Sequence, residues 1–182
     1  MQSHYFIAVP LPADVKSKVK NSFTQRTYPF KRWVHEEDLH LTLVFLGACT
    51  NEQLQKVQAS CRSLLSNWGE FSLETSALGT YGSKTNPRIF WLGVKDEPKL
   101  YRLQQDIFTI CVEAGFSLDK RAFSPHITLA RKWVGDEPYV PDQEGIMAKE
   151  QWLVSDIVLY QSVLTETPKY KTIERFPLGE KQ

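Results

Sequence analysis

Hydrophobic and polar residues follow two kinds of pattern along the chain. Short runs rich in β-branched and aromatic residues, such as Tyr5–Val9, predict strands. Apolar residues four apart between polar ones, such as Val15, Val19 and Phe23, predict amphipathic helices. The predicted strands are residues 5–9, 39–46, 71–78, 88–94, 123–130, 152–164 and 170–176, and helices are predicted to begin near residues 14, 51 and 100.

The order of these elements favours a mixed architecture. The second half of the chain repeats the strand, helix and strand order of the first half, without a steady βα alternation. At about 150 residues per domain, 182 residues correspond to one domain. We therefore expect residues 1–182 to form a single α+β domain of two similar lobes. Each lobe would be a mainly antiparallel sheet backed by helices, with a central cleft between the lobes.

Composition narrows the classes of function. The chain has 22 Lys plus Arg and 21 Asp plus Glu, a balance that excludes a protein coating polyanions by charge alone. Three cysteines without a Cys-x-x-Cys pair indicate neither a disulfide framework nor a zinc knuckle. No apolar run approaches the roughly 20 residues that cross a bilayer, and the first residues lack the basic start of a signal peptide. We expect a cytoplasmic protein with reduced thiols and no membrane contact.

The main chemical signal is a phrase that occurs twice, as His-Leu-Thr-Leu at 40–43 and His-Ile-Thr-Leu at 126–129. Both copies lie in predicted strands, where residues two apart share a face. His40 therefore lies beside Thr42, and His126 beside Thr128. A single strand histidine is more often a hydrogen-bonded structural residue. A matched pair, containing two of only four histidines, favours a functional role.

Two imidazoles that face one cleft can carry out concerted proton transfer, because one accepts a proton while neutral and the other donates a proton while charged. The hydroxyls of Thr42 and Thr128 can donate hydrogen bonds to charged oxygens, as on a phosphoryl group. The pattern thus predicts displacement at phosphorus, with His40 and His126 as catalytic residues and the two threonines in substrate binding.

These phrases and their flanks resemble the two-histidine (2H) phosphoesterases, especially the bacterial RNA 2',3'-cyclic phosphodiesterases, formerly called 2'-5' RNA ligases. The resemblance implies a bilobal fold with pseudo-twofold symmetry and no required metal or other cofactor. It also implies hydrolysis of a 2',3'-cyclic phosphate at an RNA end to a 2'-phosphate. The matching segments are residues 6–9, 33, 38–47, 87–94, 123–131 and 159–178.

By analogy with this family, His126 is expected to activate water as the base, and His40 to protonate the departing 3' oxygen. The reverse reaction, ligation to a 2'-5' bond, would exchange these roles. Arg131 matches the family arginine after the second phrase, where a guanidinium would bind phosphate. In an unbroken strand, Arg131 would point away from His126, so it reaches the cleft only if the strand bends.

Further residues near the phrases are ambiguous. Basic pairs at 31–32, 120–121 and 131–132 are typical of solvated surface, although together they could attract an RNA terminus. Trp91, in an apolar strand, is expected in the core. Four aromatic residues in predicted loops could stack on a terminal base. They are Phe30, Trp33, Trp133 and Tyr139.

The expected substrates are RNA 3' ends that carry a 2',3'-cyclic phosphate, tRNA fragments among them, or small nucleotides, handled by a monomer. Two alternatives stay open: a non-catalytic module that binds RNA ends or nucleotides, and a phosphodiesterase for small cyclic nucleotide phosphates. A metal hydrolase is disfavoured, because His35 and His40 are five residues apart and lack His-x-x-x-His spacing.

Overall fold

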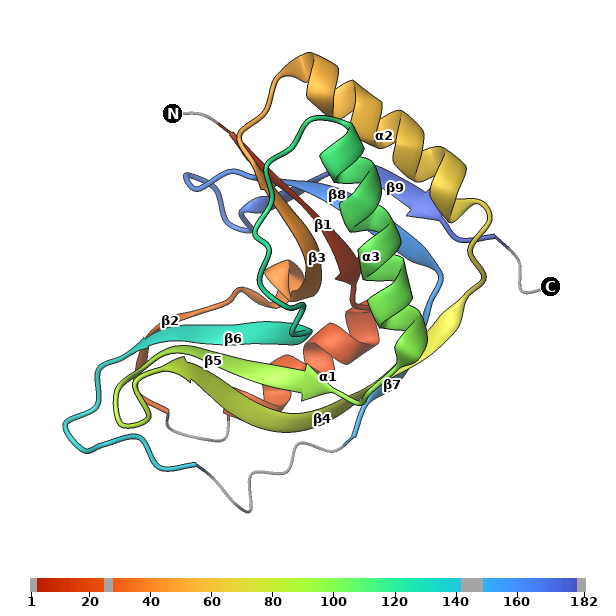
Figure 1. Ribbon diagram of the computed structural model, residues 1–182. Helices are drawn as coiled ribbons and strands as arrows, with labels where there is room; N and C mark the ends of the chain where they lie inside the picture. Colours follow the sequence, from red (N-terminus) through yellow and green to blue (C-terminus); the bar gives the residue numbers. More distant parts are fainter. Residues whose placement is uncertain (1–2, 25–27, 142–148, 180–182) are drawn as a thin grey trace.

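The structure, a computed structural model, describes residues 3–24, 28–141 and 149–179 (Figure 1). It combines antiparallel strands with helices, which confirms the α+β prediction. Among the described residues, no helix is long and apolar enough to span a bilayer. The elements are β1 (His4–Pro10), α1 (Ala13–Thr24), β2 (Phe30–Trp33), η1 (Glu36–Asp38), β3 (His40–Gly47), α2 (Asn51–Leu65), β4 (Phe71–Gly82), β5 (Pro87–Val94), α3 (Pro98–Glu113), β6 (His126–Trp133), β7 (Gln151–Val154), β8 (Asp156–Ser162) and β9 (Tyr170–Pro177).

The strands form two groups that meet at one point. Hydrogen bonding runs in the order β7-β4-β5-β6-β3-β1-β8-β9, and β2 pairs with β6 beyond the point where β3 joins it. Strands β3 and β6 join through the antiparallel pair Leu41 and Ile127. Figure 1 shows β3, β1, β8 and β9 as one group and β2, β6, β5 and β4 as the other. The two predicted sheets are therefore two halves of one open sheet.

The halves repeat one motif. Strands β1 and β3 are antiparallel neighbours connected through α1, and β5 and β6 are antiparallel neighbours connected through α3. Leu41 and Ile127 hold the same position in their two His-x-Thr-Leu phrases. Because these equivalent residues pair with each other, an approximate twofold axis passes between them.

All three helices contribute to one core on one face of the sheet. Val15 of α1, Cys61 of α2 and Leu103 of α3 are buried in the same cluster as the central Leu41 and Ile127. The opposite face carries a separate, smaller cluster of buried residues. That cluster consists of Phe6, Ala8, Val158 and Tyr160, with Tyr170 packed against it. The second face therefore has only a small apolar cluster, which leaves room there for the polar side chains of the two His-x-Thr-Leu phrases.

Local signals explain where the predicted helices begin and end. Thr50 Oγ1 accepts a hydrogen bond from the Gln53 backbone N–H at 3.1 Å, and Gln53 Oε1 accepts one from the Thr50 N–H at 3.1 Å. This capping box starts α2 and is worth about 1 kcal/mol. Gly115, with a φ of 95°, follows the end of α3, because glycine adopts this left-handed conformation without steric cost.

The four aromatic residues left ambiguous by the sequence pack against the helix-side core. Phe30 stacks on Phe90 at 5.1 Å between ring centroids, and Tyr139 packs edge-on against Trp133 at 5.4 Å. Phe30 and Tyr139 are buried, and Trp33 and Trp133 pack against the helix-side core. These rings therefore stabilise the fold and are not free to stack on a base.

Candidate active site

His40 opens β3, with both ring nitrogens hydrogen bonded. Its Nδ1 lies 2.7 Å from the Asp38 carbonyl oxygen, and its Nε2 lies 2.8 Å from Thr42 Oγ1. A carbonyl oxygen only accepts, so Nδ1 carries the hydrogen. In the neutral ring, Nε2 then holds the lone pair and accepts from the Thr42 hydroxyl. The backbone at Asp38 thus fixes which nitrogen can exchange a proton with a ligand.

His126 opens β6 in the same manner. Its Nδ1 lies 2.8 Å from the Ser124 carbonyl oxygen, again two residues earlier in the chain. The Tyr81 hydroxyl lies 2.9 Å from Ser124 Oγ and 3.5 Å from His126 Nδ1. The hydrogen of His126 is therefore also assigned to Nδ1, which leaves Nε2 for chemistry.

The pair Leu41 and Ile127 brings the two phrases together. In the antiparallel register set by this pair, His40 lies level with Thr128, and Thr42 lies level with His126. Leu41 and Ile127 point into the helix-side core, so the four polar side chains point to the other face. We call this side of the sheet the histidine face. A positive charge on His126 lowers the pKa of His40, which shows that the rings are electrostatic neighbours.

Aromatic rings flank both histidines. His40 lies 4.9 Å from Phe6 and 5.1 Å from Tyr170 between ring centroids, and His126 lies 5.1 Å from Tyr81. Trp91, expected in the core, instead pairs in register with Thr128 on the histidine face, 6.2 Å from the His126 ring. Its ring covers Gly79, where a β-carbon would collide with the indole. Each imidazole therefore packs against aromatic side chains, which restrict its orientation.

Burial sets the protonation of His40. The pKa of His40 is lowered to about 4, mainly by burial and to a smaller extent by the charges of His126 and Lys16. The hydrogen bond to the Asp38 backbone and the Asp38 charge oppose this shift but are outweighed. In the ligand-free protein, His40 is therefore a neutral imidazole at pH 7.

Arg131 reaches the histidine face because β6 contains a β-bulge. Phe90 pairs with Ala130 and Trp91 pairs with Thr128, so Leu129 is an extra residue on β6. The bulge reverses the side-chain alternation, which puts Arg131 on the side of Thr128. The electrostatic influence of Arg131 on Tyr170, in the other half of the sheet, agrees with this placement.

The first phrase has the equivalent bulge. Ile7 pairs with Val44 and Ala8 pairs with Thr42, so the extra residue on β3 is Leu43. The position equivalent to Arg131 is Phe45, which is 58% exposed on the histidine face and stands edge-on to His4 at 5.8 Å. Sequence reasoning missed Phe45, although its place five residues after His40 matches that of Arg131 after His126.

Asp38 connects His40 to strand β9 through its backbone and its side chain. Its carboxylate is buried and accepts hydrogen bonds from the backbone N–H groups of Lys169 at 3.0 Å and Tyr170 at 3.1 Å. The same residue supplies the carbonyl oxygen that orients His40. Asp38 therefore connects the imidazole to the start of β9. This link is not visible in the sequence, because the partners are 131 and 132 positions away.

Within the described ranges, no group of three or more His, Cys, Asp or Glu side chains is arranged to hold a metal ion. A cavity lined by Trp68, Arg102 and Asp106 lies where the end of α2 and the start of β4 meet α3, and it includes none of the histidine-face residues. The histidine face therefore offers two imidazoles and two hydroxyls at the central strand pair, with the guanidinium of Arg131 further along β6.

Comparison with known proteins gives consistent matches. A family model described as the 2'-5' RNA ligase superfamily matches residues 15–161. A protein of Geobacillus stearothermophilus named RNA 2',3'-cyclic phosphodiesterase is 43% identical over 97% of this chain, which spans 58% of that relative's length. A protein of Bacillus subtilis (strain 168) with the same name is 32% identical, over 98% of both chains.

Solved structures agree with these sequence matches. The crystal structure of E. coli LigT complexed with 3'-AMP superposes with a TM-score of 0.80 at 25% identity, over 98% of this chain and 99% of that one. The fold and the family expected from the two His-x-Thr-Leu phrases are thus both confirmed.

Proposed function

Because the chain belongs to the 2'-5' RNA ligase superfamily, we propose that it hydrolyses the 2',3'-cyclic phosphate at an RNA 3' end to a 2'-phosphate. The observation that carries this proposal is the pair of Nδ1 contacts to the carbonyl oxygens of Asp38 and Ser124. These contacts leave Nε2 of each imidazole as the nitrogen that exchanges a proton, and His40 Nε2 does so by giving up its contact with Thr42 Oγ1. Both imidazoles lie on the histidine face, one on each strand of the central pair. Relatives named RNA 2',3'-cyclic phosphodiesterase support the same chemistry.

The proposed reaction needs one proton acceptor and one proton donor. Nε2 of one histidine takes a proton from water as the water oxygen bonds to phosphorus. The bond from phosphorus to the 3' oxygen then breaks, and Nε2–H of the other histidine protonates that oxygen. No metal takes part in this scheme. By family analogy, His126 is the base and His40 is the acid.

The remaining groups bind the anion. Thr42 and Thr128 donate hydrogen bonds to the non-bridging phosphoryl oxygens, which become more negative as the new bond forms. Arg131, further along β6 on the same face, adds to the positive potential around this anion. A bound anion also stabilises the imidazolium form and thereby raises the pKa of His40 from its low value in the free protein. Substrate binding would thus favour the protonated form of His40, the form that can donate a proton to the departing 3' oxygen.

The same face accommodates a nucleoside. Phe45 offers an exposed ring on the first half, where a terminal base can stack. The nucleotide complex of the LigT relative fits a substrate of this class. We further propose that the protein acts as a monomer in the cytoplasm, where RNA ends and tRNA fragments would be its substrates and its three free cysteines stay reduced.

The test measures hydrolysis of an oligonucleotide with a 2',3'-cyclic end and of 2',3'-cyclic AMP, both in EDTA. We expect turnover of both substrates. The variants His40→Ala and His126→Ala should each hydrolyse them about 10²- to 10⁴-fold more slowly. His35→Asn is the matched control and should keep its rate, because it removes an exposed imidazole outside the pair but keeps a side-chain acceptor for the Glu37 N–H at the start of η1.

Each alternative predicts a different outcome. No turnover of either substrate would leave the non-catalytic binding module. Turnover of the mononucleotide alone would assign a phosphodiesterase for small cyclic nucleotides. The two histidine roles can be separated with an aryl phosphodiester, whose leaving group needs no proton: such a substrate restores the rate of the variant that lacks the acid and does not restore that of the variant that lacks the base.

A further inference from the structure

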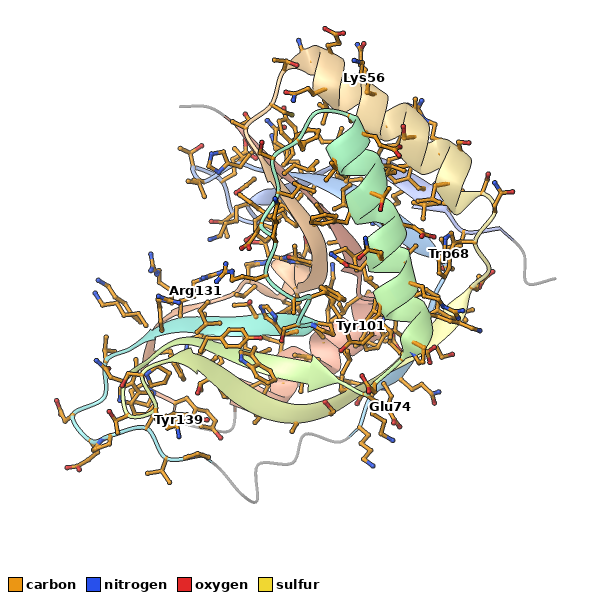
Figure 2. All side chains as sticks on the ribbon, viewed as in Figure 1. Lys56, Trp68, Glu74, Tyr101, Arg131 and Tyr139 are labelled. Atoms are coloured by element: carbon orange, nitrogen blue, oxygen red, sulfur yellow. The ribbon has the colours of Figure 1, made fainter. Side chains whose placement is uncertain are left out.

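Two arginines stand side by side at the outer end of the histidine face. In the pairing of β2 with β6, Arg32 lies directly opposite Arg131, and the next pair is Trp33 with Ala130. Trp33 and Ala130 belong to the helix-side core, so Arg32 and Arg131 project to the histidine face. Figure 2 shows Arg131 on the side of β6 opposite to Tyr139, a core residue.

The two positive charges of this pair repel each other unless an anion binds between them. Directly opposed residues in an antiparallel pair have β-carbons about 4.5 to 5.5 Å apart, and like charges at that distance destabilise the sheet. Both arginines are exposed, and in the described part of the chain neither forms an ion pair with a carboxylate. The exposed Lys31 and Lys132 adjoin them and add to the positive potential.

The equivalent end of the other half is different. There the counterpart of Arg131 is Phe45, an uncharged residue that pairs with Phe6 and stands edge-on to His4. The charge at the Arg32 end is therefore not a consequence of the shared motif. Thr128 pairs with Trp91 and Arg131 pairs with Ile89, so Arg131 lies two partner residues beyond Thr128, or roughly 7 Å at about 3.3 Å per residue. This separation is comparable with the span of one nucleotide.

We propose that Arg32 and Arg131 form a second phosphate subsite, which binds the phosphodiester on the 5' side of the terminal nucleoside while its cyclic phosphate lies between His40 and His126. The inference rests on the proposed function and deepens it: the subsite selects RNA ends over mononucleotides. A guanidinium pair suits a phosphodiester, because each planar group can donate two parallel hydrogen bonds to its oxygens.

The test compares three substrates: a diadenylate with a 2',3'-cyclic end, the same compound with an uncharged methylphosphonate linkage between its nucleosides, and 2',3'-cyclic AMP. For the unaltered protein, we expect kcat/KM for the charged diadenylate to exceed that for the methylphosphonate about tenfold, as one charged contact implies. Arg32→Gln should reduce this ratio to near one. Arg102→Gln, an exposed arginine on α3, is the matched control and should keep the ratio.

Salt gives an independent readout. Loss of one phosphate contact on a single strand should flatten the slope of log kcat/KM against log salt by about 0.7 for the diadenylate. A preference for the charged linkage that survives Arg32→Gln, or no preference in the unaltered protein, would overturn the subsite while leaving the proposed hydrolysis intact. Failure of the unaltered protein to turn over any of the three substrates would instead contradict the proposed function itself.

Discussion

His40 shows at the scale of one residue how the fold can change ordinary chemistry. A free imidazole has a pKa near 6.5 and is about one quarter charged at pH 7. Against Phe6 and Tyr170, burial lowers the pKa of His40 to about 4. The negative charge of Asp38 only partly offsets this effect. His40 is therefore neutral at pH 7, and an anion bound beside it would raise its pKa.

The first prediction concerns the titration of this ring. In the free protein, His40 should titrate near pH 4, and inorganic phosphate should raise its midpoint, because an anion stabilises the imidazolium. Because kcat/KM reports the free protein and the proposed acid His40 acts only when charged, the contribution of His40 to kcat/KM should fall as the pH rises through about 4. NMR titration of the ring, assigned with His40→Ala, measures the midpoint. A midpoint near 6.5 that phosphate does not move would contradict the account.

Asp38 connects elements that are far apart in the sequence. One residue of η1 orients His40 through its carbonyl oxygen and holds the start of β9 through its carboxylate. Tyr170, which that carboxylate fixes, packs edge-on against His40. The position of the imidazole in β3 therefore depends on β9 at the edge of the same half.

The second prediction tests this link with two variants. Asp38→Ala leaves two buried N–H groups without their acceptor, and should lower the free energy of unfolding by about 1 to 3 kcal/mol. Asp38→Asn keeps an acceptor oxygen but removes the charge that raises the pKa of His40, so the NMR midpoint of His40 should move below that of the unaltered protein. Denaturant unfolding and the titration measure the two effects. An unchanged midpoint in a folded Asp38→Asn protein would restrict Asp38 to a structural role.

The elements also show what the sequence can and cannot predict. Periodicity located the strands that carry both histidines, and the spacing within each phrase placed each threonine beside its histidine. The predicted strand 152–164 is divided at Ser155 into β7 and β8, which lie in different halves. Strand β2 was missed, because its four residues, Phe30–Trp33, are too few to show alternation.

The bulges explain the remaining differences. Leu43 and Leu129 resemble any other apolar strand residue in the sequence, and only the partner strand shows that each is an extra residue. Arg131 consequently lies on the face opposite to the one that plain alternation predicts. Asp38 could not be assigned for a related reason, since its contacts depend on the long-range packing of β9.

At the scale of the whole molecule, the centre of the sheet is approximately symmetric, whereas the two ends of the histidine face differ. The pair Leu41 and Ile127, the two Nδ1 contacts and the two bulges recur in both halves. A symmetric centre alone could not distinguish the two oxygens of a cyclic phosphate. The ends can, because one presents the exposed ring of Phe45 and the other presents Arg131. We therefore propose that the direction in which a nucleotide binds is set outside the histidine pair.

The third prediction follows from this asymmetry. If the terminal base stacks on Phe45, Phe45→Ala should lower kcat/KM for 2',3'-cyclic AMP about tenfold, since a stacked base is worth about 1 to 3 kcal/mol. Ribose 2',3'-cyclic phosphate has no base and should be hydrolysed equally by both proteins. Phe45→Tyr keeps an aromatic face and should keep the rate on both substrates. Equal losses on the two substrates would mean that Phe45 supports the sheet, and the direction of binding would then depend on the Arg131 end alone.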